Sequence, residues 1–233
     1  MNARKKLDIS AYFVVGPENT KGRDVAQMIF DVVQAGFTCI QIRSKTASAK
    51  ELIALTTQAA HAIANAGKTN EVTLLVNDRL DVVLAALAQG VKVDGIHVGQ
   101  DDIPVDVCRQ LLGNDLVIGL TAGPEELAAY LKSGDTSLID YFGIGPLRET
   151  ATKPDCGLAP NGQVLTQSPD TIKKWTQASP LPLIIGGGVK PEDLPTLAQT
   201  GIAGFFVVTA ISESDNPKAA AAQMVEAWYA NKG

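Results

Sequence analysis

The sequence is poor in residues that bind structural metals or cross-link a chain. Its 233 residues include three cysteines, Cys39, Cys108 and Cys156, which share no metal-binding or disulfide spacing. We interpret all three as structural or incidental, which favours a reducing, cytoplasmic environment. The two histidines form no Ser/His/Asp set with a detectable spacing. We expect His61 at the surface and interpret His97 as a packed or hydrogen-bonded structural residue.

Long apolar runs and an excess of positive charge are also missing. No apolar run reaches eighteen residues and no signal-peptide region opens the chain, so we predict no membrane span. The net charge is −5 and the pI is near 5.1, which argues against nonspecific nucleic-acid binding. Lysine and arginine are scattered, apart from Arg4-Lys5-Lys6. We expect residues 1–8 to form a flexible tail.

What the chain does contain is a regular alternation of strand-like and helix-like runs. The predicted strands are Ala11–Val15, Thr38–Ile42, Val72–Val76, Gly95–Val98, Leu116–Leu120, Tyr141–Ile144, Leu183–Ile185 and Gly204–Val208. The predicted helices are Gly22–Ala35, Ala49–Ala66, Leu80–Gln89, Val105–Leu112, Pro124–Ser133, Gln163–Gln177, Pro191–Gln199 and Pro217–Tyr229. Short apolar strands without alternation are typical of a parallel sheet covered by helices. Eight such units predict an α/β fold, a (β/α)₈ TIM barrel forming a single domain over residues 1–233.

Acidic residues follow two neighbouring predicted strands. Asn77 and Asp78 come after Val72–Val76, and Asp102 comes after Gly95–Val98. The helical crossover between these strands makes them parallel, so the acids lie on one edge of the sheet. Two carboxylates on one edge suit Mg²⁺, which leaves room for phosphate and water. A helix N-cap and a turn residue remain the alternative interpretation of the same acids.

At the end of the second predicted strand, polar residues occupy every second position. In an extended chain Gln41, Arg43 and Lys45 share one face, so an amide and two cations point together. Two cations at a buried strand end require an anion, although two solvated charges remain the alternative. Thr121 supplies a hydroxyl after the fifth strand, where a helix cap is an equally good interpretation.

A glycine run follows the seventh predicted strand. Gly186-Gly187-Gly188, together with the eighth strand end at Val208-Thr209, occupies the usual phosphate site of such barrels, where bare amides approach an anion. A tight turn is the simpler alternative. The predicted rim therefore offers two anion sites, one with metal and cations for a diphosphate and one with amides for a monophosphate.

One long polar loop, Leu147–Gly162, interrupts the regular alternation after the sixth strand. Long loops without secondary structure in a compact domain are usually functional or disordered. On the carboxyl rim of a barrel this loop is well placed to act as a lid.

Taken together, these motifs resemble the thiamine phosphate synthase family. The motifs are Gln41-Ile42-Arg43-Ser44-Lys45, Val76-Asn77-Asp78-Arg79, the run from Asp94 to Asp102, Gly143-Ile144-Gly145-Pro146, Thr150-Ala151-Thr152-Lys153 and Gly186-Gly187-Gly188. The resemblance covers nearly the whole chain in order. It implies a (β/α)₈ barrel transferase that joins hydroxymethylpyrimidine diphosphate to thiazole phosphate. The products are thiamine phosphate and diphosphate, and the cofactor is Mg²⁺.

The resemblance also implies three groups of site residues. The pyrimidine diphosphate would contact Gln41, Ile42, Arg43, Ser44, Lys45, Asn77, Thr121 and Lys153. The thiazole phosphate would contact Thr150, Ala151, Thr152, Gly188, Val208 and Thr209. Asp78 and Asp102 would hold Mg²⁺, while Arg43, Lys45 and Lys153 would stabilise charge on the leaving diphosphate. No residue is needed as a nucleophile.

The chain departs from the usual family pattern at three places. Thr121 replaces Ser, Gly123 replaces His, and Val208-Thr209 replaces Ile-Ser. Two alternatives to the synthase remain: a related thiazole tautomerase, which uses a His after strand five, and a non-enzymatic binder of thiamine phosphates. Such a binder would be free to lose Asp78, Asp102 or Lys153, and their presence favours the enzyme. The predicted partners are small molecules, and a homo-oligomer remains open.

Overall fold

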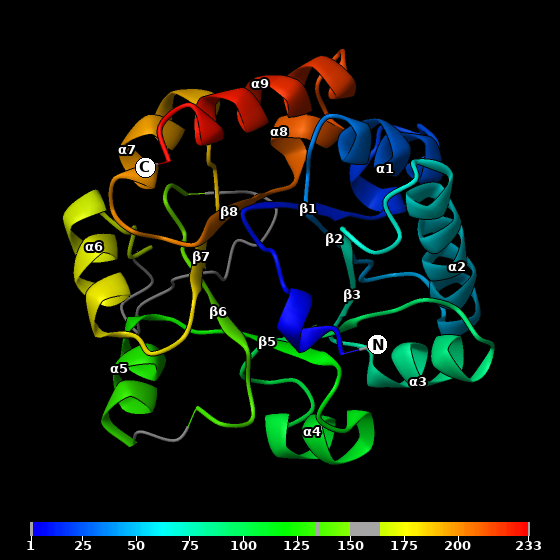
Figure 1. Ribbon diagram of the computed structural model, residues 1–233, viewed down its shortest axis with the longest axis horizontal. Helices are drawn as coiled ribbons and strands as arrows, with labels where there is room; N and C mark the ends of the chain where they lie inside the picture. The colour runs from blue at the N-terminus through cyan, green and yellow to red at the C-terminus, as the bar shows by residue number, and fades with distance from the viewer. Residues whose placement is uncertain (1, 134–135, 150–163, 233) are drawn as a thin grey trace.

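The computed structural model describes residues 2–133, 136–149 and 164–232. Parallel strands close into a barrel in which each strand is bonded to the next in the sequence and β8 is bonded to β1 (Figure 1). The strands are β1 (Ala11–Val15), β2 (Cys39–Ile42), β3 (Thr73–Asn77), β4 (Gly95–Val98), β5 (Val117–Thr121), β6 (Tyr141–Ile144), β7 (Leu183–Ile185) and β8 (Gly204–Val207). The predicted (β/α)₈ barrel is confirmed.

Helices surround this barrel on its outer side (Figure 1). They are α1 (Val25–Gln34), α2 (Ala49–Asn65), α3 (Leu80–Ala88), α4 (Val105–Leu112), α5 (Pro124–Ser133), α6 (Pro169–Ala178), α7 (Leu194–Ala198), α8 (Thr209–Ser212) and α9 (Pro217–Tyr229). Short 3₁₀ turns are η1 (Arg4–Lys6), η2 (Pro17–Asn19) and η3 (Pro191–Asp193). Within the described ranges, no helix has the length and apolar character needed to cross a membrane.

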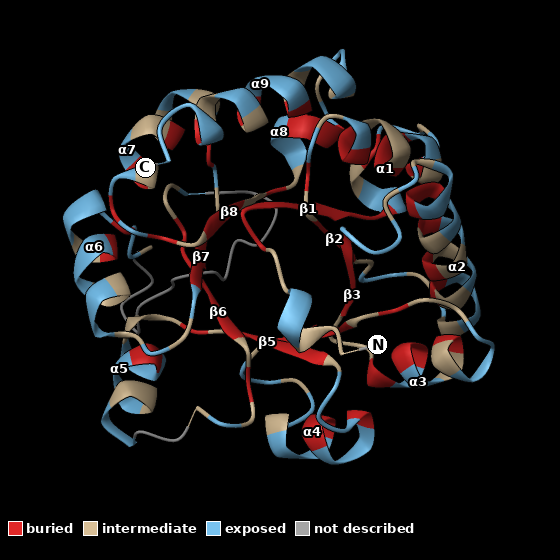
Figure 2. Ribbon diagram, viewed as in Figure 1, coloured by how far each residue is buried: buried red, intermediate tan, exposed pale blue. Residues whose placement is uncertain are grey.

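Strand side chains alternate between two hydrophobic clusters. Tyr12 and Val14 of β1 belong to the cluster inside the barrel, whereas Ala11, Phe13 and Val15 belong to the larger cluster under the helices. Successive side chains of a strand point to opposite faces, and here both faces are covered. This double burial explains why the strands are continuously apolar, and Figure 2 shows the barrel wall as almost entirely buried.

The helices that follow β6, β7 and β8 differ from the sequence-based prediction. The helix predicted over Gln163–Gln177 begins at Pro169, because the Ser168 hydroxyl caps it by accepting a hydrogen bond from the N–H of Thr171 at 3.2 Å. Residue 163 itself lies outside the described residues. The helix predicted over Pro191–Gln199 is divided into η3 and α7, and the short α8 was not predicted.

Residues 2–8 lie across the N-terminal end of the barrel, where the sequence predicts a flexible tail (Figure 1). Leu7 packs against the inner cluster. Arg4 forms an ion pair with Asp140, whose other carboxylate oxygen accepts a hydrogen bond from Arg109 at 2.9 Å. Asp140 is 136 positions away from Arg4 in the sequence, so no local sequence pattern predicts this contact. The segment closes the floor of the barrel opposite the carboxyl ends of the strands.

Candidate active site

The carboxyl ends of the strands surround an open cavity of about 1080 Å³, its mouth included. The predicted site residues that line it are Gln41, Arg43, Lys45, Asn77, Asp78, Asp102, Thr121, Gly188, Val208 and Thr209. The structure therefore brings together residues from strands on opposite sides of the barrel.

The period of two at the end of β2 decides which of its residues reach the cavity. Gln41, Arg43 and Lys45 line it, as the pattern predicts. Ile42 points the other way and is fully buried in the cluster under the helices. Ser44 does not line the cavity either; its hydroxyl donates a hydrogen bond to Glu18. The structure therefore places the side chains of Ile42 and Ser44 outside the cavity lining, and their contacts with substrate stay predictions.

Asp78 adopts a backbone conformation that few residues with a side chain adopt. Its φ is 59°, in the left-handed region, which aspartate tolerates better than most residues. The Asp78 N–H donates to the carbonyl of His97 at 2.8 Å, which holds the bend against β4. Lys45 Nζ lies 2.8 Å from Asp78 Oδ2. Strained conformations of this kind are found preferentially at functional sites, and this one directs a carboxylate into the cavity.

Asp78 and Asp102 both line the cavity, and each affects the pKa of the other. Burial and the neighbouring Asp78 raise the pKa of Asp102. Burial alone would also raise the pKa of Asp78, but hydrogen bonds from Lys45 and Asp102 lower it below its ordinary value. Two neighbouring carboxylates disfavour each other's charged form, and a cation between them would relieve that repulsion.

This carboxylate pair fits a divalent cation with few protein ligands. Among the described residues, no group of three or more His, Cys, Asp or Glu side chains is placed to hold a metal ion. A closed protein cage of the zinc type is therefore not formed by this part of the chain. Mg²⁺ commonly uses one or two carboxylates and completes its shell with phosphate oxygens and water. Asp78 and Asp102 match that donor set and its preference for oxygen.

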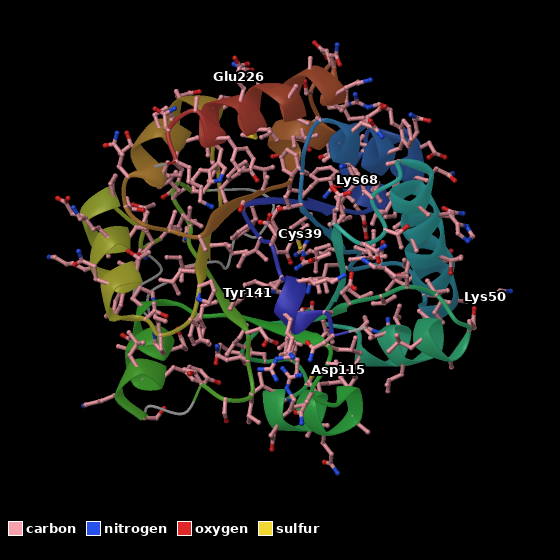
Figure 3. All side chains as sticks on the ribbon, in the orientation of Figure 1. Cys39, Lys50, Lys68, Asp115, Tyr141 and Glu226 are labelled. Carbon is pink, nitrogen blue, oxygen red and sulfur yellow. The ribbon has the colours of Figure 1, made fainter. Side chains whose placement is uncertain are left out.

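A chain of buried hydrogen bonds crosses the barrel beneath the cavity. Gln41 Nε2 donates to the Tyr12 hydroxyl at 2.6 Å, and that hydroxyl lies 2.9 Å from the Tyr141 hydroxyl. His97 bonds Tyr141 through Nδ1 at 2.8 Å and Thr121 Oγ1 through Nε2 at 2.9 Å. Figure 3 labels Tyr141 inside the ring of helices. Burial raises the pKa of both tyrosines well above the ordinary value, so both keep their hydrogens.

Sequence reasoning missed the two tyrosines of this chain. Tyr12 and Tyr141 stand within apolar runs, and nothing local distinguishes them from other core aromatics. The predicted structural role of His97 agrees with its bonds on both ring nitrogens. The signal that could have found the tyrosines is their position in inward-facing register on strands whose ends were already predicted to carry the site.

The opposite side of the cavity presents backbone instead of charge. Gly187 and Gly188 both have φ of 77°, a conformation that a residue with a Cβ atom rarely adopts. Their N–H groups donate to no acceptor in the part of the chain that the structure describes. Gly188 and the neighbouring Val208 and Thr209 line the cavity, with Phe206 and Ile184 adding apolar surface. Unpaired amides beside an apolar wall suit a phosphate attached to a ring.

Several predicted site residues lie outside the described residues. These are Thr150, Ala151, Thr152 and Lys153, together with Cys156 and the part of the predicted lid from 150 to 162. Their contacts with substrate and the lid itself stay predictions. Of the other residues interpreted as structural, Cys39 and Cys108 are buried and unbridged, and His61 is exposed.

Fold and cavity together define a class of protein: a (β/α)₈ barrel whose cavity, at the carboxyl ends of the strands, has charged side chains on one side and glycine backbone on the other. A sequence model described as thiamine monophosphate synthase matches residues 11–211. The chain is 38% identical over 222 residues to the thiamine-phosphate synthase of Corynebacterium efficiens, covering 95% of this chain and 96% of that protein. It is 39% identical over 219 residues to the thiamine-phosphate synthase of Corynebacterium jeikeium, covering 94% of each.

Among solved structures, the thiamine phosphate pyrophosphorylase from Pyrococcus furiosus covers this chain completely, with a TM-score of 0.77 and 21% sequence identity. At that identity the likeness concerns the fold. The family model and the two relatives carry the assignment, because each spans most of the chain. The protein belongs to the thiamine monophosphate synthase family.

Proposed function

We propose that this protein joins hydroxymethylpyrimidine diphosphate to thiazole phosphate, forming thiamine phosphate and diphosphate. The observation that carries the proposal is one cavity with two different sets of anion-binding groups. We name the set Arg43, Lys45, Asp78 and Asp102 the charged half, and the set Gly187, Gly188, Val208 and Thr209 the glycine half. A reaction between a diphosphate and a monophosphate uses both halves at once.

The charged half would bind the pyrimidine diphosphate. Asp78 and Asp102 would hold Mg²⁺, which supplies positive charge for the diphosphate oxygens when bound. Arg43 lines the cavity and makes no side-chain hydrogen bond within the described ranges, so its guanidinium is available for phosphate. Lys45 forms an ion pair with Asp78, so the Lys45 ammonium lies beside the residues that would hold the metal ion.

The chemical step needs charge stabilisation and alignment of the reactants. The bond from the pyrimidine methylene carbon to the diphosphate oxygen breaks, and its electron pair leaves with the diphosphate. The lone pair of the thiazole nitrogen forms the new bond to that carbon. Arg43 and Lys45 stabilise the charge that grows on the leaving oxygens, and we assign the same role to Lys153. No protein nucleophile takes part.

Gln41 supports a role in holding the pyrimidine ring. It is buried, lines the cavity and uses its amide nitrogen on Tyr12, so its amide oxygen is left for the ligand. The ring of the substrate carries an amino group, which is a suitable donor. Asn77 at the end of β3 offers a second amide on the same side.

The tautomerase alternative requires a base near the thiazole ring. Gly123 has no side chain, and its neighbours Ala122 and Pro124 cannot accept a proton. His97 is bonded on both ring nitrogens, which gives it a structural task in the barrel. These features support alkyl transfer over isomerisation as the activity of this cavity.

The direct test mixes the purified protein with both substrates and Mg²⁺ and measures thiamine phosphate and diphosphate. We expect the two products to appear in equal amounts and only when both substrates are present. A chelator should abolish the reaction, and added Mg²⁺ should restore it. Formation of neither product under these conditions would contradict the proposal.

A further inference from the structure

The side chain of Glu18 connects the turn after β1 to the segment after β2. Four donors converge on its Oε1 atom. They are the hydroxyl of Ser44, the N–H of Lys45 at 3.0 Å, and the N–H and hydroxyl of Thr46 at 3.3 and 2.9 Å. One carboxylate oxygen is thus the common acceptor for three successive residues.

Within the described ranges, the segment 44–46 makes no hydrogen bond from backbone to backbone that would fix its conformation. In the described ranges, the N–H groups of Lys45, Thr46 and Ala47 donate to side chains and to no backbone carbonyl. Ala47 bonds the Ser44 hydroxyl at 2.9 Å, and that hydroxyl is in turn bonded to Glu18. Side chains therefore decide the conformation of the segment 44–46, and Glu18 contributes most of the bonds.

Close packing places Glu18 where it can do this. A Cβ atom at Gly16 would lie 1.8 Å from the carbonyl oxygen of Arg43, so only glycine lets the two connections meet. The N–H of Arg43 also donates to the carbonyl of Val15 at 2.9 Å. The turn after β1 and the end of β2 consequently form one unit.

The segment 44–46 carries a cation of the charged half. The Lys45 side chain is 60% exposed, so packing does not fix it. Its ammonium reaches Asp78 Oδ2 at 2.8 Å from a backbone that Glu18 holds. Glu18 itself does not line the cavity, and the bonds described above join it to uncharged donors. Its influence on a ligand would act through the backbone.

We propose that Glu18 is a positioning residue that sets the affinity for the diphosphate-bearing substrate by holding Lys45 and the end of β2 in place. The inference rests on the proposed function of the charged half. Its anion-binding part can be measured separately with inorganic diphosphate and Mg²⁺.

The test compares three substitutions of Glu18 with one matched control. Glu18→Ala removes the acceptor. Glu18→Gln keeps the oxygen at the same reach without charge, and Glu18→Asp keeps the charge but shortens the reach. The control is Glu51→Ala, because Glu51 also accepts a backbone N–H and a hydroxyl, both from Ser48, at 2.8 and 2.7 Å. Thermal unfolding of each variant checks that the fold is intact.

We expect Glu18→Ala to raise KM for the pyrimidine diphosphate roughly tenfold, with KM for the thiazole phosphate changed less than about twofold. Binding of inorganic diphosphate with Mg²⁺, measured by calorimetry, should weaken by a similar factor. Glu18→Gln should stay within about threefold of the unsubstituted protein, while Glu18→Asp should resemble Glu18→Ala.

Two outcomes would overturn the inference. One is Glu18→Ala behaving like Glu51→Ala in both diphosphate measurements. The other is full function of Glu18→Asp with loss in Glu18→Gln, since charge and not geometry would then be at work. If the unsubstituted protein forms no thiamine phosphate, the proposed function fails, and calorimetry with inorganic diphosphate still decides the role of Glu18.

Discussion

The charged half and the glycine half of the cavity use different parts of the chain for the same kind of task. In the charged half, the side chains of residues such as Arg43 and Asp78 line the cavity. In the glycine half, Gly187 and Gly188 line the cavity without a side chain, so a ligand there would meet the backbone itself. Substitutions should therefore affect the two substrates separately.

The largest effect is expected at the carboxylate pair. Asp78→Asn or Asp102→Asn should lower turnover by roughly 10²-fold or more, because a lost carboxylate weakens Mg²⁺ and leaves diphosphate charge uncompensated. Steady-state kinetics at several Mg²⁺ concentrations measure the effect. Asp81→Asn is the control, since Asp81 is exposed and pairs with Arg79 away from the cavity. Full activity of both cavity variants, with and without a chelator, would contradict the assignment.

The next largest effects are expected at two cationic side chains, Arg43 and Lys153. Arg43→Ala should raise KM for the pyrimidine diphosphate by roughly tenfold, because a charge-assisted phosphate contact is lost. Lys153→Ala should instead reduce turnover more than it changes KM, if Lys153 meets charge mainly in the transition state. Initial rates with each substrate varied in turn separate the two. Unchanged turnover with only a raised KM in Lys153→Ala would reverse this ranking.

A substitution in the glycine half should affect the other substrate. Gly188→Ala places a Cβ atom 3.1 Å from the Arg148 side chain, which must give way by a few tenths of an ångström, and the φ of 77° strains the backbone of the new residue. We expect KM for the thiazole phosphate to rise roughly fivefold, and a stability loss of about 1 kcal/mol. KM for the pyrimidine diphosphate should stay nearly constant. If only KM for the pyrimidine diphosphate rose, the assignment of the two halves to the two substrates would be reversed.

A smaller effect is expected on stability, at the support of the glycine half. Arg148 bonds both the Gly188 carbonyl, at 2.8 Å, and the Asp193 carboxylate. Burial would raise the pKa of Asp193, but the hydrogen bond from Arg148 lowers it below its ordinary value. A lowered folded-state pKa stabilises the fold above the ordinary aspartate pKa of about 4, and the benefit is lost as pH falls through the folded value.

Asp193→Asn should therefore lower the melting temperature by roughly 1–3 °C at pH 7, consistent with less than about 1 kcal/mol for a partly exposed pair. The difference from the unsubstituted protein should shrink as the pH falls below the ordinary aspartate pKa of about 4, and should vanish below the lowered folded-state pKa of Asp193. Glu192→Gln is a suitable control, because Glu192 is exposed and lies 3.9 Å from Lys190. A difference that does not change with pH would show that the ion pair is not its cause.

For isomerisation of the thiazole alone, we expect no effect of the protein. When the pyrimidine substrate is withheld, the protein should not accelerate isomerisation of a thiazole carboxylate, because Gly123 supplies no base. NMR in deuterated buffer follows the thiazole directly. Enzyme-dependent isomerisation, combined with failure to release diphosphate from the full mixture, would favour the tautomerase.

Local patterns predicted the barrel and several of the residues that line the cavity. The period of two at Gln41, Arg43 and Lys45 identified the side chains that enter the cavity, since strand geometry alone fixes it. What could not be predicted depends on distant partners. Arg4 meets Asp140 only after the barrel closes, and the Tyr12–Tyr141 contact joins strands on different sides of it. The start of α6 was predicted too early, because the Ser168 cap begins the helix at Pro169.

One order of hydrogens satisfies every bond of the buried chain. The Gln41 amide nitrogen donates to Tyr12, Tyr12 donates to Tyr141, and Tyr141 donates to His97 Nδ1. His97 then carries its hydrogen on Nε2 and donates it to the Thr121 oxygen, whose own hydrogen is left to point elsewhere. The chain thus shows an acceptor at one end and a donor at the other. Reversing this order would require each hydroxyl and the imidazole to move a hydrogen, so the orientation of one group depends on that of the next.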